Sequence, residues 1–299
     1  MHMSALLPVL LSLATASGDV QATVEMPSSH MAGGSFAVKI VYSAAEAGQL
    51  ESWRLGMGAF ELDGKPLGER PAGAPIALPA GAKITVELDL AALLPSDSNF
   101  SLALAGKEPT QVTVLKPAPA GIIFLDLAPA DLAKYQVVLQ TDLGDMTVQF
   151  YPNEAPNHVR NFLDLCATGF YDGVGFHRVS PTFMIQGGDP NTKNPSPASW
   201  GSGSGPRQLN AEFNKIHHER GILSMARSTN QNSASCQFFV MTKKSGFLDN
   251  QYSVFGKLVA GFDTLDKIAN SKGKAGPDGT VKPDVLPRIK KAVIITAAE

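Results

Sequence analysis

The sequence predicts a mainly β protein of two domains, and three observations support this. Residues 36–114 contain short runs in which apolar and polar residues alternate, and a period of two is typical of half-buried strands. The alternation returns at residues 137–150, and a strand-like apolar run occupies residues 176–185. Apolar residues at helical spacing occur in two segments of the second half, 159–166 and 263–270.

Composition and charge fit this division. The chain has 299 residues, 44% of them hydrophobic, which is typical of a folded globular protein. Residues 1–132 carry 7 Lys and Arg against 13 Asp and Glu, whereas residues 133–299 carry 18 against 14. The two halves therefore differ in sign. An excess of four positive charges is too weak to predict a nucleic-acid partner.

The first residues resemble an export signal. An apolar run at Ala5–Ala14 is followed by the small residues Ala14-Thr15-Ala16, so we predict a signal peptide over residues 1–18. The start lacks the Lys or Arg such signals carry, and a first strand or a disordered end is the alternative. We expect a periplasmic or secreted protein, with a cytoplasmic one as the alternative. No later apolar run reaches the roughly 18 residues of a membrane span.

Residues 19–115 are predicted to form a small β-sandwich, for which an immunoglobulin-like architecture is one candidate. Strands are expected around residues 36–42, 84–90, 102–104 and 112–114, and Asp63-Gly64 indicates a hairpin turn. No cluster of His, Asp, Glu or Ser in this domain has ligand or catalytic spacing. The role of the domain is therefore not predicted.

Residues 116–132 are predicted to be a linker, because two prolines and a glycine lie among small residues at Lys116–Gly121. Ile122–Leu125 could alternatively be a last strand of the first domain. The second domain is then expected to span residues 133–299.

The second domain should begin with a hairpin that turns at Asp142–Asp145. Pro156 suits the first turn of a helix and Gly169 its end. Residues 190–210, rich in Pro, Gly, Ser and Asn, predict a long surface loop of the kind that shapes a binding rim. After the helix at 263–270, Val293–Thr296 is expected to be a closing strand.

The segment Phe176–Asp189 carries the strongest functional signal. It places Arg178 and Gln186, two strong hydrogen-bonding groups, among large apolar residues and ends at a glycine pair. A few polar groups in an apolar cavity are typical of a small-molecule or peptide site. The alternatives are that Phe183 and Met184 are ordinary core residues and that Arg178 is held in a structural ion pair.

Three ordered blocks resemble the cyclophilins, which are peptidyl-prolyl cis-trans isomerases. The first is the segment just described, with the sequence FHRVSPTFMIQGGD. The second is Gly221–Arg227 followed by Ser235–Val240, and the third is Phe247–Asp249 with Val254–Lys257. Together they extend over about half the chain, which makes the resemblance far more specific than one short motif.

The resemblance implies a closed eight-stranded antiparallel barrel capped by two helices, and an isomerase acting on proline-containing segments of unfolded or flexible proteins. It implies Arg178 as the catalytic residue, with Gln186 and Phe239 beside it. The residues implied to bind substrate are His177, Phe183, Met184, Ala226, Arg227, Gln237, Phe247, Leu248 and Tyr252.

These residue types suit the reaction. A peptide bond before proline favours trans by only about 0.5–1 kcal/mol, but its isomers are separated by roughly 18–20 kcal/mol. Near the barrier top the prolyl nitrogen regains a lone pair, and the rigid, permanently charged guanidinium of Arg178 can donate to it. Gln186 can both donate to and accept from the substrate backbone. The reaction breaks no covalent bond, so no metal or cofactor is expected.

Three residues depart from the family pattern. Arg227 stands where an asparagine is common, Phe247 where eukaryotic members have tryptophan, and Tyr252 where they have histidine. Bacterial cyclophilins often show the same replacements, so activity is expected to persist. Cyclosporin binding, which the tryptophan favours, is expected to be weak.

Two further functions compete with the enzyme. The barrel could be a binding module or holdase chaperone with negligible turnover, or the first domain could carry the role as an adhesion or tethering module. The two cysteines, Cys166 and Cys236, are expected to be separate buried thiols rather than a disulfide. The adjacent His217 and His218 are not expected to bind a metal, because neighbouring residues of a strand point to opposite faces.

Overall fold

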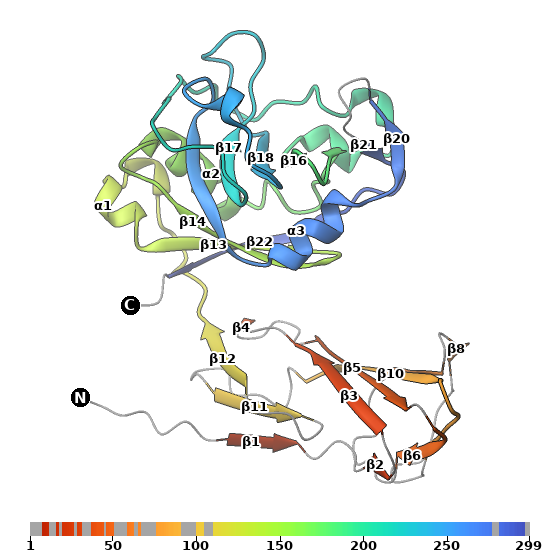
Figure 1. Cartoon of the computed structure of the whole chain (residues 1–299). Helices are drawn as coiled ribbons and strands as arrows, with labels where there is room; N and C mark the ends of the chain where they lie inside the picture. The colour runs from red at the N-terminus through yellow and green to blue at the C-terminus, as the bar shows by residue number, and fades with distance from the viewer. Residues whose placement is uncertain are drawn as a thin grey trace, which may run out of the picture. The chain divides into compact units, whose positions relative to one another are not determined.

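The structure is a computed structural model that divides into two compact units, residues 1–116 and 117–299 (Figure 1). The residues it describes are 8–11, 16–17, 20–26, 29–31, 37–44, 46–50, 59–62, 65–66, 76–90, 100–104, 110–276 and 281–296.

The described part of the first unit consists of strands in three sheets, ordered β1-β11-β12-β4, β3-β5-β10-β7-β8 and β2-β6-β9. The strands are β1 (Pro8–Leu11), β2 (Ala16–Ser17), β3 (Val20–Glu25), β4 (Ser29–Met31), β5 (Ala37–Ala44), β6 (Gly48–Leu50), β7 (Ala59–Leu62), β8 (Lys65–Pro66), β9 (Ile76–Leu78), β10 (Lys83–Asp89), β11 (Phe100–Leu104) and β12 (Thr110–Leu115).

The alternating pattern of the first unit does form strands. In the antiparallel pair of β5 and β10, Ile40 lies opposite Val86 and Tyr42 opposite Ile84, and all four are buried. β7 and β8 pair antiparallel as the predicted hairpin, while its turn residues 63–64 lie outside the described residues. An immunoglobulin-like sandwich is not confirmed, because the described strands form three sheets, in one of which β1 pairs in parallel with β11 and β4 with β12.

Part of the predicted export signal is a strand. Pro8–Leu11 forms β1, which pairs in parallel with β11, in line with the alternative of a first strand. This pairing does not test where the protein is located, so export stays a prediction.

Residues 117–132, expected to be a linker, instead pack onto the second unit. The Ala118 N–H donates to the Ile294 carbonyl at 2.8 Å, and Phe124 and Leu132 are buried in the core of this unit. The segment 122–125 is not a strand, since Phe124–Asp126 form the short 3₁₀ helix η2 and Pro129–Leu132 form α1. The large apolar side chains explain the difference, because burying each one contributes about 1.5–3 kcal/mol.

The second unit contains a ten-stranded sheet in the order β20-β21-β15-β16-β18-β17-β19-β14-β13-β22. Its strands are β13 (Tyr135–Thr141), β14 (Gly144–Phe150), β15 (Arg178–Val179), β16 (Met184–Gly187), β17 (Ile222–Met225), β18 (Phe238–Met241), β19 (Val254–Ala260), β20 (Gly273–Ala275), β21 (Val281–Pro283) and β22 (Ile289–Thr296).

Eight of these strands match the expected number, and the β20–β21 hairpin extends the sheet beyond them. The expected closure into a barrel is not confirmed, because β20 and β22 stand at the two ends of the strand order. Backbone hydrogen bonds do connect the segment before β15 with the start of β22. The Gly173 N–H donates to Ile289 O at 2.7 Å, and the Ile289 N–H donates to Val174 O at 2.8 Å.

Both predicted helices are present, as α2 (Pro156–Ala167) and α3 (Phe262–Ala269). The apolar face of α2 is buried, with Phe162 in ring contact with Tyr171, Phe238 and Phe255 at centroid distances of 5.0–5.4 Å. Cys166 and Cys236 are buried and free, as predicted. The apolar face of α2 and these rings form a core on one face of the sheet.

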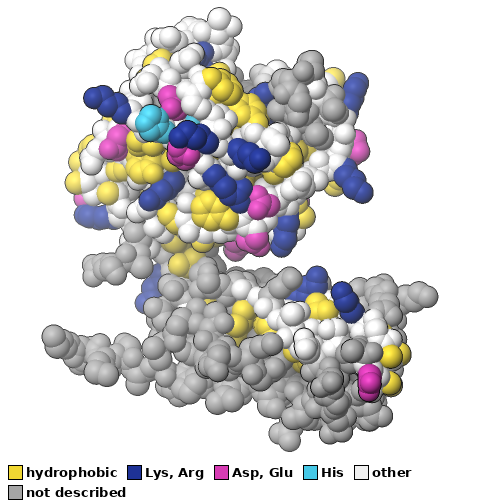
Figure 2. Space-filling view, in the orientation of Figure 1, with side chains coloured by type: hydrophobic (Ala, Val, Ile, Leu, Met, Phe, Trp, Pro, Cys, Tyr) yellow, Lys and Arg dark blue, Asp and Glu magenta, His cyan; other side chains and the backbone are white. Residues whose placement is uncertain are grey.

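The second unit carries both signs of charge on the face visible in Figure 2. Lys and Arg side chains are interspersed there with Asp and Glu and with small apolar areas. Among the described residues, no helix is both long and apolar enough to cross a bilayer.

Candidate functional site

Alternate residues of β16 and β18 belong to different clusters on the two faces of the sheet. Ile185, Phe238 and Val240 lie in the large core that α2 covers. Met184 and Phe239, their neighbours in the chain, lie in a second cluster on the other face. Successive residues of a strand point to opposite faces, so the same strands supply both the core and a surface site.

Strand register brings the polar residues of the site into one row. Arg178 on β15 lies opposite Gln186 on β16, Gln186 lies opposite Phe239 on β18, and Phe239 lies opposite Ser224 on β17. Directly opposed residues of an antiparallel pair share a face, so the four side chains project from the same side. Residues separated by up to 61 positions in sequence thereby meet.

A cavity of about 670 Å³ lies over this row. Its volume is within the range of small-molecule and cofactor sites. All predicted site residues except His177 and Gln237 line it, and Ser180, Thr182 and Ser245 also line it, which the sequence did not predict. The complete lining is Arg178, Ser180, Thr182, Phe183, Met184, Gln186, Ala226, Arg227, Phe239, Ser245, Phe247, Leu248 and Tyr252.

The cavity combines a buried apolar base with partly exposed edges. Met184, Phe239 and Leu248 are each at most 5% exposed. Phe183 stacks on Phe247 with centroids 5.7 Å apart, and Phe247 is 67% exposed. An apolar ring could therefore enter between exposed aromatic groups and rest on buried ones.

Arg178 is held by a chain of hydrogen bonds through two glutamines. Its Nη1 donates to Gln186 Oε1 at 3.1 Å, and Gln186 Nε2 donates to Gln237 Oε1 at 3.0 Å. Gln237 Nε2 donates to the carbonyls of Gly201 and Gly203 at 3.1 and 2.8 Å. Because each amide uses its oxygen in one direction and its nitrogen in the other, the loop carbonyls fix which atom of Gln186 faces Arg178. We call this the polar chain.

Two predicted residues, His177 and Gln237, do not line the cavity. Gln237 is the middle of the polar chain, so it contacts the site through Gln186. His177 is buried, and that burial lowers its pKa to about 4. His177 is therefore neutral at pH 7 beside the permanently charged Arg178.

Arg227 is fixed at the edge of the cavity. Its Nε and Nη2 donate to the Gln251 carbonyl at 3.1 and 2.9 Å, and its guanidinium carbon lies 4.6 Å from the centroid of the Tyr252 ring. The same guanidinium carbon lies 5.9 Å from the centroid of the Phe213 ring. The lining carries two arginines, Arg178 and Arg227, and no carboxylate among the residues described.

The sequence did not identify the group behind Phe239. His218 is buried and stacks on the Phe239 ring, with centroids 6.0 Å apart and planes 17° apart. His217 and His218 were expected to point apart, but both Nδ1 atoms reach the carboxylate of Asp249, at 2.6 and 2.9 Å. They lie in a loop rather than a strand, which removes the constraint assumed from sequence.

These bonds affect the charges of the group. The hydrogen bond from His217, with one from the His218 N–H, holds the pKa of Asp249 well below its usual range. Burial lowers the pKa of His218, and it outweighs the opposing effect of Asp249. The Asp249 carboxylate is therefore ionised at neutral pH. In the sequence, the only signal for Asp249 is its place directly after Phe247-Leu248.

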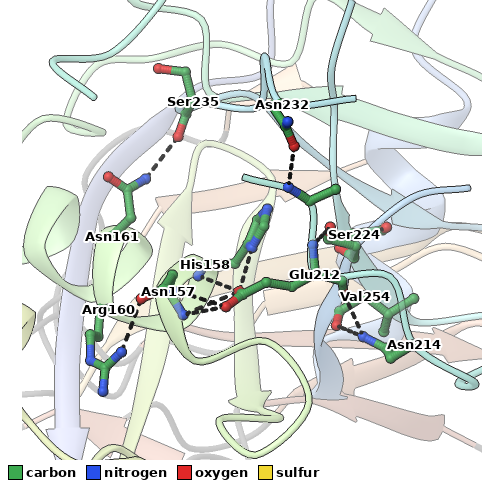
Figure 3. Close-up of polar contacts among 12 residues, drawn as sticks. Asn157, His158, Arg160, Asn161, Glu212, Asn214, Ser224, Asn232, Ser235 and Val254 are labelled. Carbon is green, nitrogen blue, oxygen red and sulfur yellow. Dashed lines mark hydrogen bonds and ion pairs between the residues drawn. The ribbon is translucent and has the colours of Figure 1, made fainter. Parts of the chain in front are cut away.

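A second carboxylate, Glu212, secures the neighbouring loop to α2, as Figure 3 shows. Its oxygens accept the backbone N–H groups of Asn157 and His158 at 3.0–3.1 Å, and the His158 Nδ1 at 2.6 Å. Such a carboxylate satisfies orphan N–H groups at the start of a helix. The Glu212 N–H in turn donates to Ser253 Oγ at 2.9 Å, next to Tyr252 of the cavity.

The described residues contain no group of three or more His, Cys, Asp or Glu arranged to hold a metal ion. The side chains available at the cavity are two guanidinium groups, one amide, four hydroxyl-bearing side chains (Ser180, Thr182, Ser245 and Tyr252) and an apolar base.

Comparisons with known proteins agree on one family. Residues 136–294 match the family described as "Cyclophilin type peptidyl-prolyl cis-trans isomerase/CLD". A "Probable peptidyl-prolyl cis-trans isomerase" of Brucella abortus is 44% identical over 164 residues, covering 53% of this chain and 81% of the relative. "Peptidyl-prolyl cis-trans isomerase CYP18-1" of Arabidopsis thaliana is 41% identical over 144 residues, covering 47% of this chain and 85% of the relative.

Solved structures include a cyclophilin type peptidyl-prolyl cis-trans isomerase of Cryptosporidium parvum, determined in the presence of the dipeptide Ala-Pro. It is 30% identical, covers 55% of this chain and 99% of its own, and has a TM-score of 0.47. The family match covers more than half of the chain and agrees with the residues gathered at the cavity. The chain belongs to the cyclophilin type peptidyl-prolyl cis-trans isomerases, and it is an enzyme of that class.

Proposed function

We propose that the second unit speeds rotation about X-Pro peptide bonds in unfolded or flexible protein segments, and thereby assists their folding. The observation that carries this proposal is the placement of Arg178, held by the polar chain, in the lining of a cavity of about 670 Å³ that has a buried apolar base.

Arg178 acts on the twisted state of the substrate. During rotation the prolyl nitrogen loses amide resonance and becomes an acceptor, so a donor aimed at it stabilises the twisted state more than either isomer. Donors of this kind are typically worth about 2.7–4 kcal/mol each. The bond from Nη1 to Gln186 at 3.1 Å limits how the guanidinium can turn, which keeps its donors in place before the substrate arrives.

The apolar base holds the proline ring while the preceding residue rotates. Met184, Phe239 and Leu248 are buried and offer carbon surface to the pyrrolidine ring. Gln186, whose amide is part of the polar chain, would contact the substrate backbone. No bond is made or broken, so these residues need only grip one side of the rotating bond and stabilise its twisted form.

The test is an isomerisation assay on the full chain with a peptide containing one X-Pro bond. We expect the wild type to accelerate exchange and Arg178→Ala to lose about 10²–10³-fold of the catalysed rate, in line with the loss of one preorganised donor. Arg220→Ala is the matched control. Arg220 pairs with Asp266 through bonds of 2.9 and 3.0 Å and does not line the cavity, so its loss should leave the rate unchanged.

The alternative is a peptide-binding or holdase module on the same fold. Arg227, which replaces the common asparagine and is bound to the Gln251 carbonyl, is the feature that favours it. A wild type that binds the peptide but does not accelerate exchange, with no change in Arg178→Ala, would support the binder and reject the enzyme.

A further inference from the structure

The group behind Phe239 connects two parts of the cavity that the strands alone do not connect. One part is the base, formed by Phe239 on β18. The other is the rim segment, residues 245–252, which carries Phe247, Leu248 and Tyr252. His218 touches both.

His218 contacts the base of the cavity through its ring. The His218 ring stacks on Phe239, and its Nε2 lies 3.1 Å from Ser224 Oγ. Ser224 is the residue opposite Phe239 on the adjacent strand, and it is fully buried. The ring of His218 therefore packs on the base residue and bonds to that residue's cross-strand neighbour.

Contacts with the rim segment come from the other side of His218. The carboxylate of Asp249 accepts the His218 N–H and Nδ1 through one oxygen, both at 2.9 Å. The Ser245 N–H donates to the His218 carbonyl at 2.9 Å. Backbone and side chain of one residue thus hold the rim segment at two points, Ser245 and Asp249, on either side of Phe247 and Leu248.

The bonds also fix the orientation of the ring. A carboxylate only accepts, so Nδ1 carries the proton and Nε2 of the neutral ring accepts from the Ser224 hydroxyl. That hydroxyl has one proton, for which the Ser253 carbonyl at 3.1 Å is a competing acceptor. Nδ1 and Nε2 therefore serve different parts of the cavity, and substitution can separate them.

We propose that His218 is a positioning residue that sets the distance between the base and the rim segment of the substrate cavity, through its contacts with Phe239, Ser224 and Asp249. This inference rests on the proposed function only in that the cavity binds a proline peptide. His218 itself does not line the cavity, so it acts through Phe239 and the rim segment.

Three variants of the full chain test this. An asparagine amide can replace the Nδ1 donor and a glutamine amide can replace the Nε2 group, so His218→Asn keeps the bond to Asp249 and His218→Gln keeps the bond to Ser224. His217→Gln is the control, because His217 bonds to the same carboxylate but is exposed and makes no contact with Phe239 or Ser224.

The expected results differ between the variants. His218→Gln loses the side-chain bond to Asp249 while the backbone bonds of residue 218 to the rim segment remain, so KM and the dissociation constant of a proline peptide should rise about tenfold, the change that about 1.4 kcal/mol produces. Both variants remove the ring from behind Phe239, so kcat should fall about tenfold in both, whereas KM should change little in His218→Asn, which keeps the bond to Asp249. His217→Gln should match the wild type in both constants.

The inference is overturned if both His218 variants keep wild-type constants. It is equally overturned if both lose activity only in proportion to the unfolded fraction, measured by thermal melting, because the role would then be structural. Peptide affinity separates this from the proposed function. A wild type without turnover rejects the enzyme, whereas a tenfold weaker affinity in His218→Gln but not in His217→Gln would still support the positioning role.

Discussion

The two faces of the sheet in the second unit are built from the same strands and differ in what they contain. On the face under α2, Phe238 lies among Phe162, Tyr171 and Phe176, with ring centroids 5.3–6.2 Å apart. On the other face, its neighbour Phe239 packs on His218 and Tyr252 under an open cavity. Adjacent phenylalanines thus have separate tasks, one in holding the fold and one in the site.

The two faces differ in the kind of interaction that holds their side chains in place. On the face under α2, aromatic rings pack together, and these apolar contacts stabilise the fold. On the cavity face, hydrogen bonds to each other and to Gln237 hold Arg178 and Gln186 in place, and bonds from His217 and His218 hold Asp249. Substitutions on the first face should therefore change stability, and those on the second should change activity.

The largest effect is expected from exchanging the two phenylalanines for alanine. Phe238→Ala should lower the free energy of unfolding of the second unit by about 3–5 kcal/mol, because it leaves a void among three rings. Phe239→Ala should lower catalysis more than stability. Chemical denaturation together with the isomerisation assay checks both, and equal losses of stability would contradict the separation of the faces.

A pH effect should follow from His177, which is buried beside the half-exposed Arg178. Its folded-state pKa of about 4 lies below the usual value, so the unfolded chain binds a proton between about pH 6.5 and 4 that the folded chain does not. The free energy of unfolding should therefore fall as the pH drops through this range, by about 1–3 kcal/mol, and level off below it.

Burial lowers the pKa of His218 as well, so this residue contributes in the same direction. Denaturation curves at several pH values measure the slope, and His177→Gln should flatten much of it. An unchanged slope in that variant would assign the effect to other groups.

A smaller effect is expected on breaking the polar chain without touching the cavity. Gln237→Leu removes the acceptor of Gln186 Nε2, so Gln186 and Arg178 lose their fixed orientation. The value of kcat/KM should fall about 5–30-fold, equivalent to about 1–2 kcal/mol, the range of a buried hydrogen bond and its unpaired partner. As a control, Gln136→Leu on β13, which is not part of the polar chain, should leave kcat/KM unchanged. Equal rates in both variants would show that orientation does not matter.

The smallest effect is expected at Arg227. Its contact with the Tyr252 ring at 4.6 Å is partly exposed, so Arg227→Ala should raise KM only about two- to fivefold, or about 0.5–1 kcal/mol. Arg227→Lys should not restore the wild-type value, because an ammonium cannot make the paired bonds to the Gln251 carbonyl. Full recovery by lysine would indicate that charge alone matters.

Much of the site was accessible from the sequence because it follows strand periodicity and a continuous motif. The ordered blocks that resemble the cyclophilins predict most of the residues that line the cavity, and Met184 and Gln186 share its face because they are two positions apart on one strand. The long loop at 190–210 was expected to shape the rim, and its Gly201 and Gly203 carbonyls instead anchor the polar chain.

What escaped the sequence depends on loops that meet only in the folded chain. His218 and Asp249 are 31 residues apart and neither lies in a strand; Asp249 ends the third block, but nothing in the sequence pairs it with His218. The packing of Phe124 and Leu132 on the second unit was also missed, since their local sequence has the composition of a linker. Composition indicates the conformation that a segment prefers locally. Whether its side chains become buried depends on a surface formed by residues distant in sequence.

The most direct measurement is the exchange rate of an X-Pro peptide bound to the full chain, obtained by NMR exchange spectroscopy at saturating protein. The account predicts that bound peptide interconverts far faster than the tens of seconds of the free peptide, and that Arg178→Lys, which keeps the charge but not the fork, loses most of this gain while still binding. Bound peptide that exchanges no faster than free peptide, or an Arg178→Lys variant as fast as the wild type, would contradict it.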